Sequence, residues 1–174
     1  MKRIATVSRT NEILEKYNLH AKKKYGQNFI IDPNIITKIV SNANIDNHTT
    51  VIEVGPGIGA LSQGLCEVAK KVLAFEIDED MVNVLKNEFK EVDNFHLTHQ
   101  DFLTVDLKDV LEDLNNVKVV EVSYEARKQI RTCYKEHIRK SNLSILLPRF
   151  CTIYTRRFVK ILRNIHKNTC CHKH

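Results

Sequence analysis

The chain has 174 residues, of which 43% are hydrophobic and 28% charged, a composition typical of one globular domain with its own core. It has no apolar stretch of the roughly 20 residues that cross a bilayer, and its first residues lack the apolar run of a secretory signal. The five cysteines include no Cys-x-x-Cys pair, so neither a metal site nor a disulfide framework is indicated. We expect a cytoplasmic, monomeric protein with reduced thiols and no membrane contact.

The net charge of +6 is distributed unevenly. Residues 1–120 carry 14 Lys and Arg against 18 Asp and Glu, a net charge of −4, whereas residues 121–174 carry 13 against 3, a net charge of +10. The second part has no Gly and no Asp, which commonly form turns and helix caps, and it contains four of the five cysteines. We therefore predict a boundary at residue 120, followed by a basic tail that is not native to the fold. The alternative is a basic arm that binds RNA.

Residues 1–120 alternate between helical and strand patterns, which is typical of a parallel α/β sheet with flanking helices. Asp32 followed by Pro33 suits the N-cap and first position of a helix. The expected elements are a helix over 10–17, a helix from 33, a strand over 50–54, a helix over 60–69, a strand over 72–77, a helix capped by Asp78, a strand over 95–99 and a strand from 117. Because the pattern stops there, we expect the sheet to be truncated after its fourth strand.

Three features lie at the ends of successive predicted strands. A glycine-rich loop, Gly55 to Gly59, joins the first strand to a helix, Glu76 ends the second strand, and Asp101 follows the third. Ligands of an open α/β sheet bind at the carboxyl ends of its strands. Glycines let the backbone approach a ligand, Glu76 suits ribose hydroxyls, and Asp101 can accept a hydrogen bond from an adenine amino group. Together these features predict a site for a nucleoside-bearing ligand.

Two other functions remain open on these residues. A nucleotide-dependent dehydrogenase is one, because Gly55-x-Gly57-x-x-Ala60 also satisfies the loose dinucleotide fingerprint. Glu53 argues against it, because that strand position is normally apolar in a dinucleotide-binding fold. The second alternative is a non-catalytic basic RNA-binding protein that uses the tail.

Several motifs resemble those of the small-subunit ribosomal RNA adenine dimethyltransferases. The run Lys23–Asp32, with Gln-Asn-Phe at its centre, resembles their opening motif, and Glu53–Leu61 resembles their cofactor loop. Glu76–Asp78 and Asp101-Phe102 resemble the next two motifs. Over residues 10–120 the resemblance implies a Rossmann-like class I methyltransferase fold. It also implies transfer of methyl groups from S-adenosylmethionine to the exocyclic amine of adenines in 16S rRNA of the small ribosomal subunit precursor.

The resemblance assigns site residues one by one. The expected cofactor residues are Asn28 and Ile30 beside the cofactor, Gly55 and Gly57 at its methionine end, Glu76 at the ribose, and Asp101 with Phe102 at the adenine. The residues expected to meet rRNA phosphates are Lys22, Lys23 and Lys24. No metal ligand is implied.

One motif of the family is absent from the sequence. Family members follow the fourth strand with Asn-Leu-Pro-Tyr, which holds the flipped target adenine, whereas this chain has Glu121-Val122-Ser123-Tyr124 and no Asn-x-Pro-Tyr anywhere. A planar amine is a poor nucleophile, and carbonyl acceptors must draw on its hydrogens. Val122 offers no such side-chain acceptor. We therefore assign no catalytic residue and predict an inactive fragment that also lacks the family's C-terminal helical domain.

Overall fold

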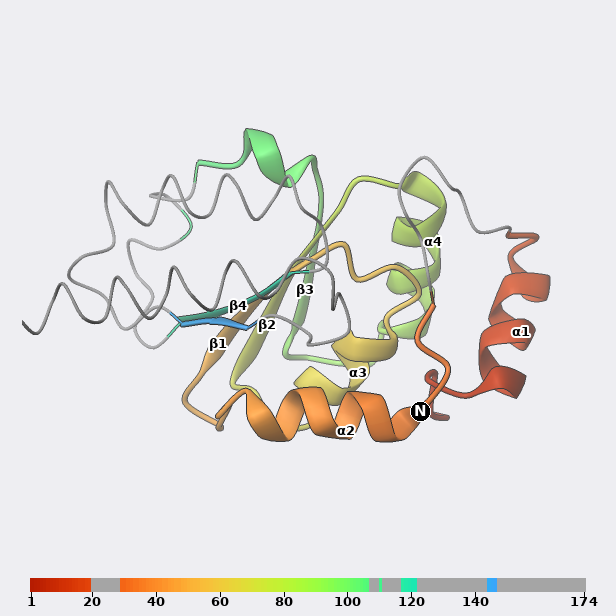
Figure 1. Cartoon of the computed structure of the whole chain (residues 1–174). Helices are drawn as coiled ribbons and strands as arrows, with labels where there is room; N and C mark the ends of the chain where they lie inside the picture. Colours follow the sequence, from red (N-terminus) through yellow and green to blue (C-terminus); the bar gives the residue numbers. More distant parts are fainter. Residues whose placement is uncertain (20–28, 107–109, 111–116, 122–143, 147–174) are drawn as a thin grey trace, which may run out of the picture.

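The computed structural model describes residues 1–19, 29–106, 110, 117–121 and 144–146 (Figure 1). Within them lies one sheet with the strand order β3-β2-β1-β4-β5, and every neighbouring pair of strands is parallel. The strands are β1 (Thr50–Val54), β2 (Lys71–Glu76), β3 (Phe95–His99), β4 (Val117–Glu121) and β5 (Ser144–Leu146). The order reverses at β1, so the carboxyl ends of β1 and β4 form the topological switch point where ligands of such sheets bind.

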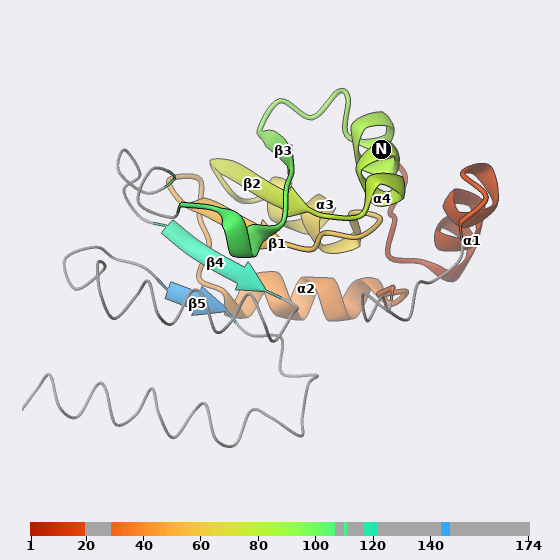
Figure 2. The same cartoon turned by 90° about the horizontal axis from the view of Figure 1, so that it is seen from above.

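Four α-helices are described: α1 (Val7–Lys16), α2 (Pro33–Asn42), α3 (Ala60–Cys66) and α4 (Glu79–Glu88). A short 3-10 helix, η2, spans Phe102–Thr104. The helix starts follow from local sequence, because Asp32 and Asp78 accept backbone hydrogen bonds from Asn34 and Asp80 at the beginnings of α2 and α4. The outermost helix is α1, which lies beside α4 (Figure 2). None of the described helices is long and apolar enough to cross a membrane.

The core lies between the sheet and the helices, and the N-terminal residues belong to it. Ile4 and Ile13 are fully buried together with Leu65 of α3 and Met81 and Leu85 of α4. Full burial of a side chain of this size stabilises a fold by about 1.5–3 kcal/mol. Residues 1–19 are therefore an integral part of the domain.

The structure confirms the predicted elements up to the fourth strand, with changed boundaries in the first and third helices and in the second strand, which spans Lys71–Glu76 instead of 72–77. The first helix begins at Val7 instead of residue 10, because Thr6 accepts a hydrogen bond from the Arg9 amide and so forms the N-cap. The helix predicted over 60–69 ends at Cys66. Asn94 explains this end, because its side-chain amide donates to the carbonyls of Cys66 and Ala69 at 3.0 Å each, which satisfies acceptors that a longer helix would have used.

The expectation that the sheet is truncated after its fourth strand is wrong, because β5 pairs with β4 from Lys118↔Ser144 to Val120↔Leu146. This strand has only three residues, which is too short for a recognisable hydrophobic period. It also lies within the segment predicted to be a basic tail. The boundary at residue 120 stays a prediction.

Candidate functional site

The parallel register aligns the strand ends along one edge of the sheet. Val54 at the end of β1 is paired with Phe75 on one side and with Glu121 on the other. Glu76, the last residue of β2, is paired with His99, the last residue of β3. The loops that follow these strands therefore start next to one another, as expected from the sequence.

The glycine-rich loop after β1 has a backbone that requires glycine. Gly55, Gly57 and Gly59 have φ values of 71°, 59° and 87°, in the left-handed region that other residues rarely adopt. Gly55 is exposed, and its N–H donates to the Phe75 carbonyl at 2.9 Å. Gly59 is the N-cap of α3 and is buried against the ring of Phe89. The loop thus connects β1, β2 and the start of α3.

Glu76 holds this loop through its carboxylate. Its Oε2 accepts a hydrogen bond from the Gly57 N–H at 3.1 Å, and its Oε1 accepts from Ile77 N–H and Asp78 N–H at 2.9 Å each. The side chain is buried. Burial raises the pKa of Glu76, and the three backbone N–H groups oppose that rise. Because a carboxylate can accept about four hydrogen bonds, room for about one further donor remains.

Glu53 is a second buried acid at this edge. It is 1% exposed, and neither its Oε2 nor the nearby Ser62 Oγ has a hydrogen-bond partner among the described residues. Burial raises the pKa of Glu53 to about 7; the adjacent Ser62 hydroxyl opposes this rise and the charge of Glu76 adds to it. A buried carboxylate with an unpartnered oxygen favours a cationic ligand. From the sequence, Glu53 argued against a dehydrogenase and began the motif that resembles the cofactor loop, but it was not among the predicted site residues, although an acid within an apolar strand was a visible signal.

Asp101 and Phe102 lie after β3 and have local structural roles. Asp101 caps η2, because its Oδ1 accepts a hydrogen bond from the Leu103 N–H at 2.9 Å. Phe102 is buried with its ring edge against Phe75, at a centroid distance of 5.3 Å. Since Phe75 precedes Glu76, this packing fixes the end of β3 beside the end of β2. The predicted contacts of Asp101 and Phe102 with an adenine stay predictions.

The opening motif is described only from Phe29 onward. A Cβ atom built on Gly57 would lie 3.9 Å from Cε1 of Phe29, so the motif contacts the glycine-rich loop. Ile30 is half-buried and packs against the core. Asn28 and the three lysines Lys22, Lys23 and Lys24 lie outside the described residues. The structure thus brings Gly55, Gly57 and Glu76 together, with the Phe29–Ile30 segment beside them.

The family model for ribosomal RNA adenine dimethylases matches residues 18–148. The chain belongs to this family. The match continues past the boundary predicted at residue 120 and includes β5.

Two curated proteins that are similar to this chain carry the name ribosomal RNA small subunit methyltransferase A. The chain is 49% identical to the protein from Bacillus pumilus over 112 residues, which are 64% of this chain and 38% of the relative. It is 42% identical to the protein from Enterococcus faecalis over 145 residues, which are 83% of this chain and 49% of the relative. The chain therefore spans less than half the length of these two relatives.

Solved structures confirm the class I methyltransferase fold. The structure of the 23S rRNA methyltransferase ErmE matches with a TM-score of 0.54 and 26% identity, over 63% of this chain and 43% of that one. A dimethyladenosine transferase from Plasmodium falciparum matches with a TM-score of 0.52 and 23% identity, over 63% of this chain and 38% of that one. The expected Rossmann-like architecture, a parallel sheet with flanking helices, is thus confirmed.

The contact between Gly59 and Phe89 gives a first prediction for this dimethylase-family chain. A Cβ atom at residue 59 would lie 2.3 Å from Cε2 of Phe89, whereas one at Gly55 would have no atom within 4 Å. Both positions have positive φ, so Gly55→Ala is a matched control that carries only the backbone strain. We expect Gly59→Ala to lower the free energy of unfolding by about 1–3 kcal/mol more than Gly55→Ala, as measured by urea denaturation. Equal losses would contradict the close contact.

The buried Glu53 predicts an unusual dependence of stability on pH. Its pKa is about 7 in the folded chain against an ordinary value of 4.5, so between these pH values the folded state holds a proton that the unfolded state has released. Stability from this group is therefore complete below about pH 4.5 and falls as the pH rises to about 7. The loss is on the order of 3 kcal/mol.

We expect Glu53→Gln to flatten this fall and to make the chain more stable than the wild type at pH 8. Urea denaturation at pH 5 and pH 8 measures both effects. Glu67→Gln is the control, because Glu67 follows α3 and is an exposed carboxylate. A Glu53→Gln profile parallel to that of the wild type would show that Glu53 is not a strained buried acid.

Proposed function

We propose that this chain is the S-adenosylmethionine-binding part of an rRNA adenine dimethyltransferase that acts on 16S rRNA in the small ribosomal subunit precursor. The observation that carries the proposal is the pair of buried carboxylates, Glu53 and Glu76, beside the glycine-rich loop. S-Adenosylmethionine brings a positive sulfonium and a positive ammonium group together with a ribose. A buried anionic site that lacks a cation among the described residues suits such a ligand.

The same acids disfavour the dehydrogenase alternative. In a dinucleotide-binding fold the pyrophosphate binds at the glycine-rich loop and the helix N-terminus. Here Glu53 is buried one residue before the end of β1 and two residues before Gly55, so its unpartnered oxygen would lie near a second anion. Like charges at short range in a buried site repel strongly. A cationic nucleoside therefore fits these residues better than a dinucleotide does.

The residues present fit the cofactor. We infer that Gly55 and Gly57 let the backbone approach its methionine end, and that Glu53 offers its unpartnered Oε2 to a positive group there. We assign the ribose to Glu76 and the adenine to Asp101, with Phe102 holding Asp101 in place and Asn28 and Ile30 beside the cofactor. When bound, S-adenosylmethionine supplies an electrophilic methyl group.

The RNA side of the proposal rests on the family. Both relatives described above carry the name of a small subunit rRNA methyltransferase, which supports rRNA as the acceptor. We assign its phosphates to Lys22, Lys23 and Lys24, because lysine neutralises phosphate charge without reading sequence. We propose that the protein acts as a monomer in the cytoplasm.

The role of Glu76 is tested by Glu76→Ala in the full chain. Loss of a hydrogen bond to a charged group costs about 1.5–3 kcal/mol, so we expect the dissociation constant for S-adenosylhomocysteine to rise by about 10- to 150-fold in calorimetry. Since the carboxylate also holds the Gly57 N–H, Glu76→Gln, which keeps one acceptor oxygen, should lose less. Unchanged affinity in both variants, or protection of the wild type by NADH in place of S-adenosylhomocysteine, would refute the proposed site.

Cofactor binding and methyl transfer are expected to separate in this chain. The cofactor residues lie after β1, β2 and β3, whereas the family's acceptor motif follows β4, where this chain has Val122 in place of asparagine. Removal of one group that stabilises the transition state lowers the rate by about 100- to 1,000-fold. We therefore expect cofactor binding without measurable methylation.

The assay is tritiated methyl transfer to undermethylated small ribosomal subunits. A full-length relative with the Asn-Leu-Pro-Tyr motif serves as the positive control, and calorimetry with S-adenosylmethionine establishes binding in the same preparation. Incorporation within tenfold of the control would show that residues other than Asn-Leu-Pro-Tyr position the adenine.

A further inference from the structure

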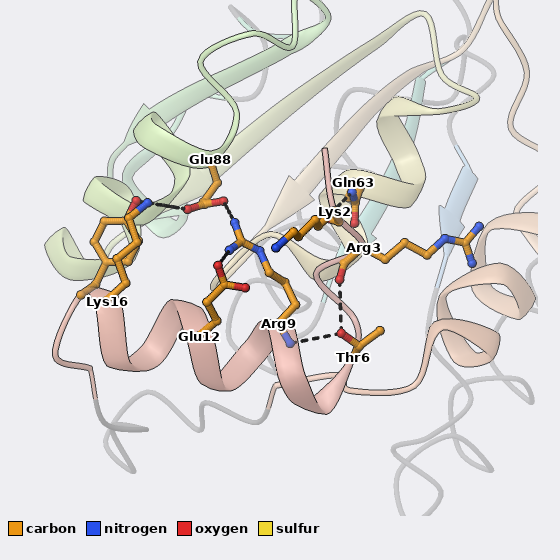
Figure 3. A network of polar contacts seen from close by, with 9 residues as sticks. Lys2, Arg3, Thr6, Arg9, Glu12, Lys16, Gln63 and Glu88 are labelled. Carbon is orange, nitrogen blue, oxygen red and sulfur yellow. Dashed lines mark hydrogen bonds and ion pairs between the residues drawn. The ribbon is translucent and has the colours of Figure 1, made fainter.

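The carboxylate of Glu88, the last residue of α4, accepts hydrogen bonds from three side chains, two in α1 and one in the residue that follows α1. It accepts hydrogen bonds from Arg9 Nη2, from Lys16 Nζ at 3.1 Å and from the Tyr17 hydroxyl at 3.2 Å. Arg9 is held from its own helix as well, through an ion pair with Glu12 (Figure 3). The side chain of Glu88 is only 5% exposed and that of Arg9 14% exposed. This cluster, which we call the Glu88 clamp, joins segments more than 70 residues apart in sequence.

The next residue, Phe89, supports the glycine-rich loop. Its ring fills the space beside Gly59, where a Cβ atom would meet Cε2 at 2.3 Å and Cζ at 2.7 Å. The same ring lies 4.3 Å from that of Phe95 at the start of β3. Two adjacent residues at one helix end thus contact both the N-terminal helix and the loop of the proposed cofactor site.

A second connection joins the N-terminal segment to the same loop. Gln63, one turn after Gly59 in α3, accepts a hydrogen bond from Ile4 N–H at 2.8 Å and donates to the Lys2 carbonyl at 3.1 Å (Figure 3). Residues 1–19 are therefore held against α4 through Glu88 and against α3 through Gln63. Gln63 is four residues after Gly59, and Glu88 is next to Phe89, whose ring contacts Gly59.

Attachment alone does not account for the Glu88 clamp. Burial of Ile4 and Ile13 already fixes the segment to the core and is not directional. Three hydrogen bonds that converge on one buried carboxylate are directional, so they set the orientation of α1 on α4. A buried ion pair serves such specificity more than it serves net stability.

We infer that Glu88 is a positioning residue that couples the docking of α1 to the geometry of the glycine-rich loop. The inference rests on the proposed function, because the coupling is measured through binding of the proposed cofactor. Coupling between two sites is reciprocal. If the clamp improves ligand binding at the loop, the bound ligand must in turn lower the population of the state in which α1 is open, which slows exchange of the α1 amides.

The experiment measures hydrogen exchange of the α1 amides in the full chain, with and without S-adenosylhomocysteine, together with the dissociation constant from calorimetry. In the wild type we expect the ligand to slow exchange over residues 7–16. In Glu88→Gln we expect this slowing to be lost and the dissociation constant to rise by about five- to tenfold. Lys16→Met, which removes one half-exposed donor, should give a smaller effect of the same sign and serves if Glu88→Gln does not fold.

Two controls separate positioning from general stability. Glu91→Gln removes an exposed carboxylate that forms an ion pair with Lys90 and not with α1. It should change neither the exchange of the α1 amides nor the dissociation constant. Asn94→Ala removes the hydrogen bonds to Cys66 and Ala69; it should destabilise the fold but keep the slowing of α1 exchange by the ligand. Equal loss of coupling in Asn94→Ala and Glu88→Gln would show that the Glu88 clamp contributes only to general stability, and would overturn the inference.

The outcomes for the wild type distinguish the two proposals. Binding of S-adenosylhomocysteine without slower exchange in α1 overturns the coupling and leaves the proposed function standing. Absence of binding overturns the proposed function and the ligand-sensed coupling with it. A ligand-free arm still tests the mechanical link, because Gly59→Ala must displace Phe89 and should accelerate α1 exchange more than Gly55→Ala does; equal rates would overturn the link.

Discussion

The candidate site depends on one interaction, the carboxylate of Glu76 bound to the backbone N–H groups of Gly57, Ile77 and Asp78. It ties the loop after β1 to the turn that begins α4, so two strand connections share one buried acceptor. The left-handed backbone of the glycine-rich loop can persist because surrounding contacts determine it. Gly57 is held by Glu76, Gly55 by the Phe75 carbonyl, and Gly59 by the Phe89 ring. The loop is thus held in shape by contacts within the chain itself.

This arrangement has an electrostatic cost. Burial raises the pKa of both Glu53 and Glu76, and the charge of Glu76 adds to the rise at Glu53. A fold selected only for stability would place an apolar residue at Glu53, since the rest of β1 is buried and uncharged. Sites where local stability is sacrificed are commonly functional. A positively charged ligand of the kind proposed above would offset this cost.

The sequence predicts those features that have a local signature. The Asp32-Pro33 helix start, the buried strands and the glycine-rich loop each follow from residues close together in the chain, and Glu76 and Asp101 follow from the rule that ligands bind at strand ends. The three-residue β5 gives no period to detect. The Glu88 clamp joins Arg9 to a residue 79 positions away, and no local pattern predicts such a pair. The unpartnered Oε2 of Glu53 is also invisible in sequence, because burial and missing hydrogen bonds are properties of the packed core.

The topology separates the proposed cofactor residues from the position where the family's acceptor motif would follow. β1 lies at the reversal of strand order, with β2 and β3 on one side and β4 and β5 on the other. Val54 faces Phe75 across one ladder and Glu121 across the other, so β1 is the only strand that both halves share in the described sheet. The contacts that shape the glycine-rich loop come from Glu76, Phe75 and Phe89, all on the β2 side. A change in sequence after β4 therefore removes none of these contacts, which hold the glycine-rich loop.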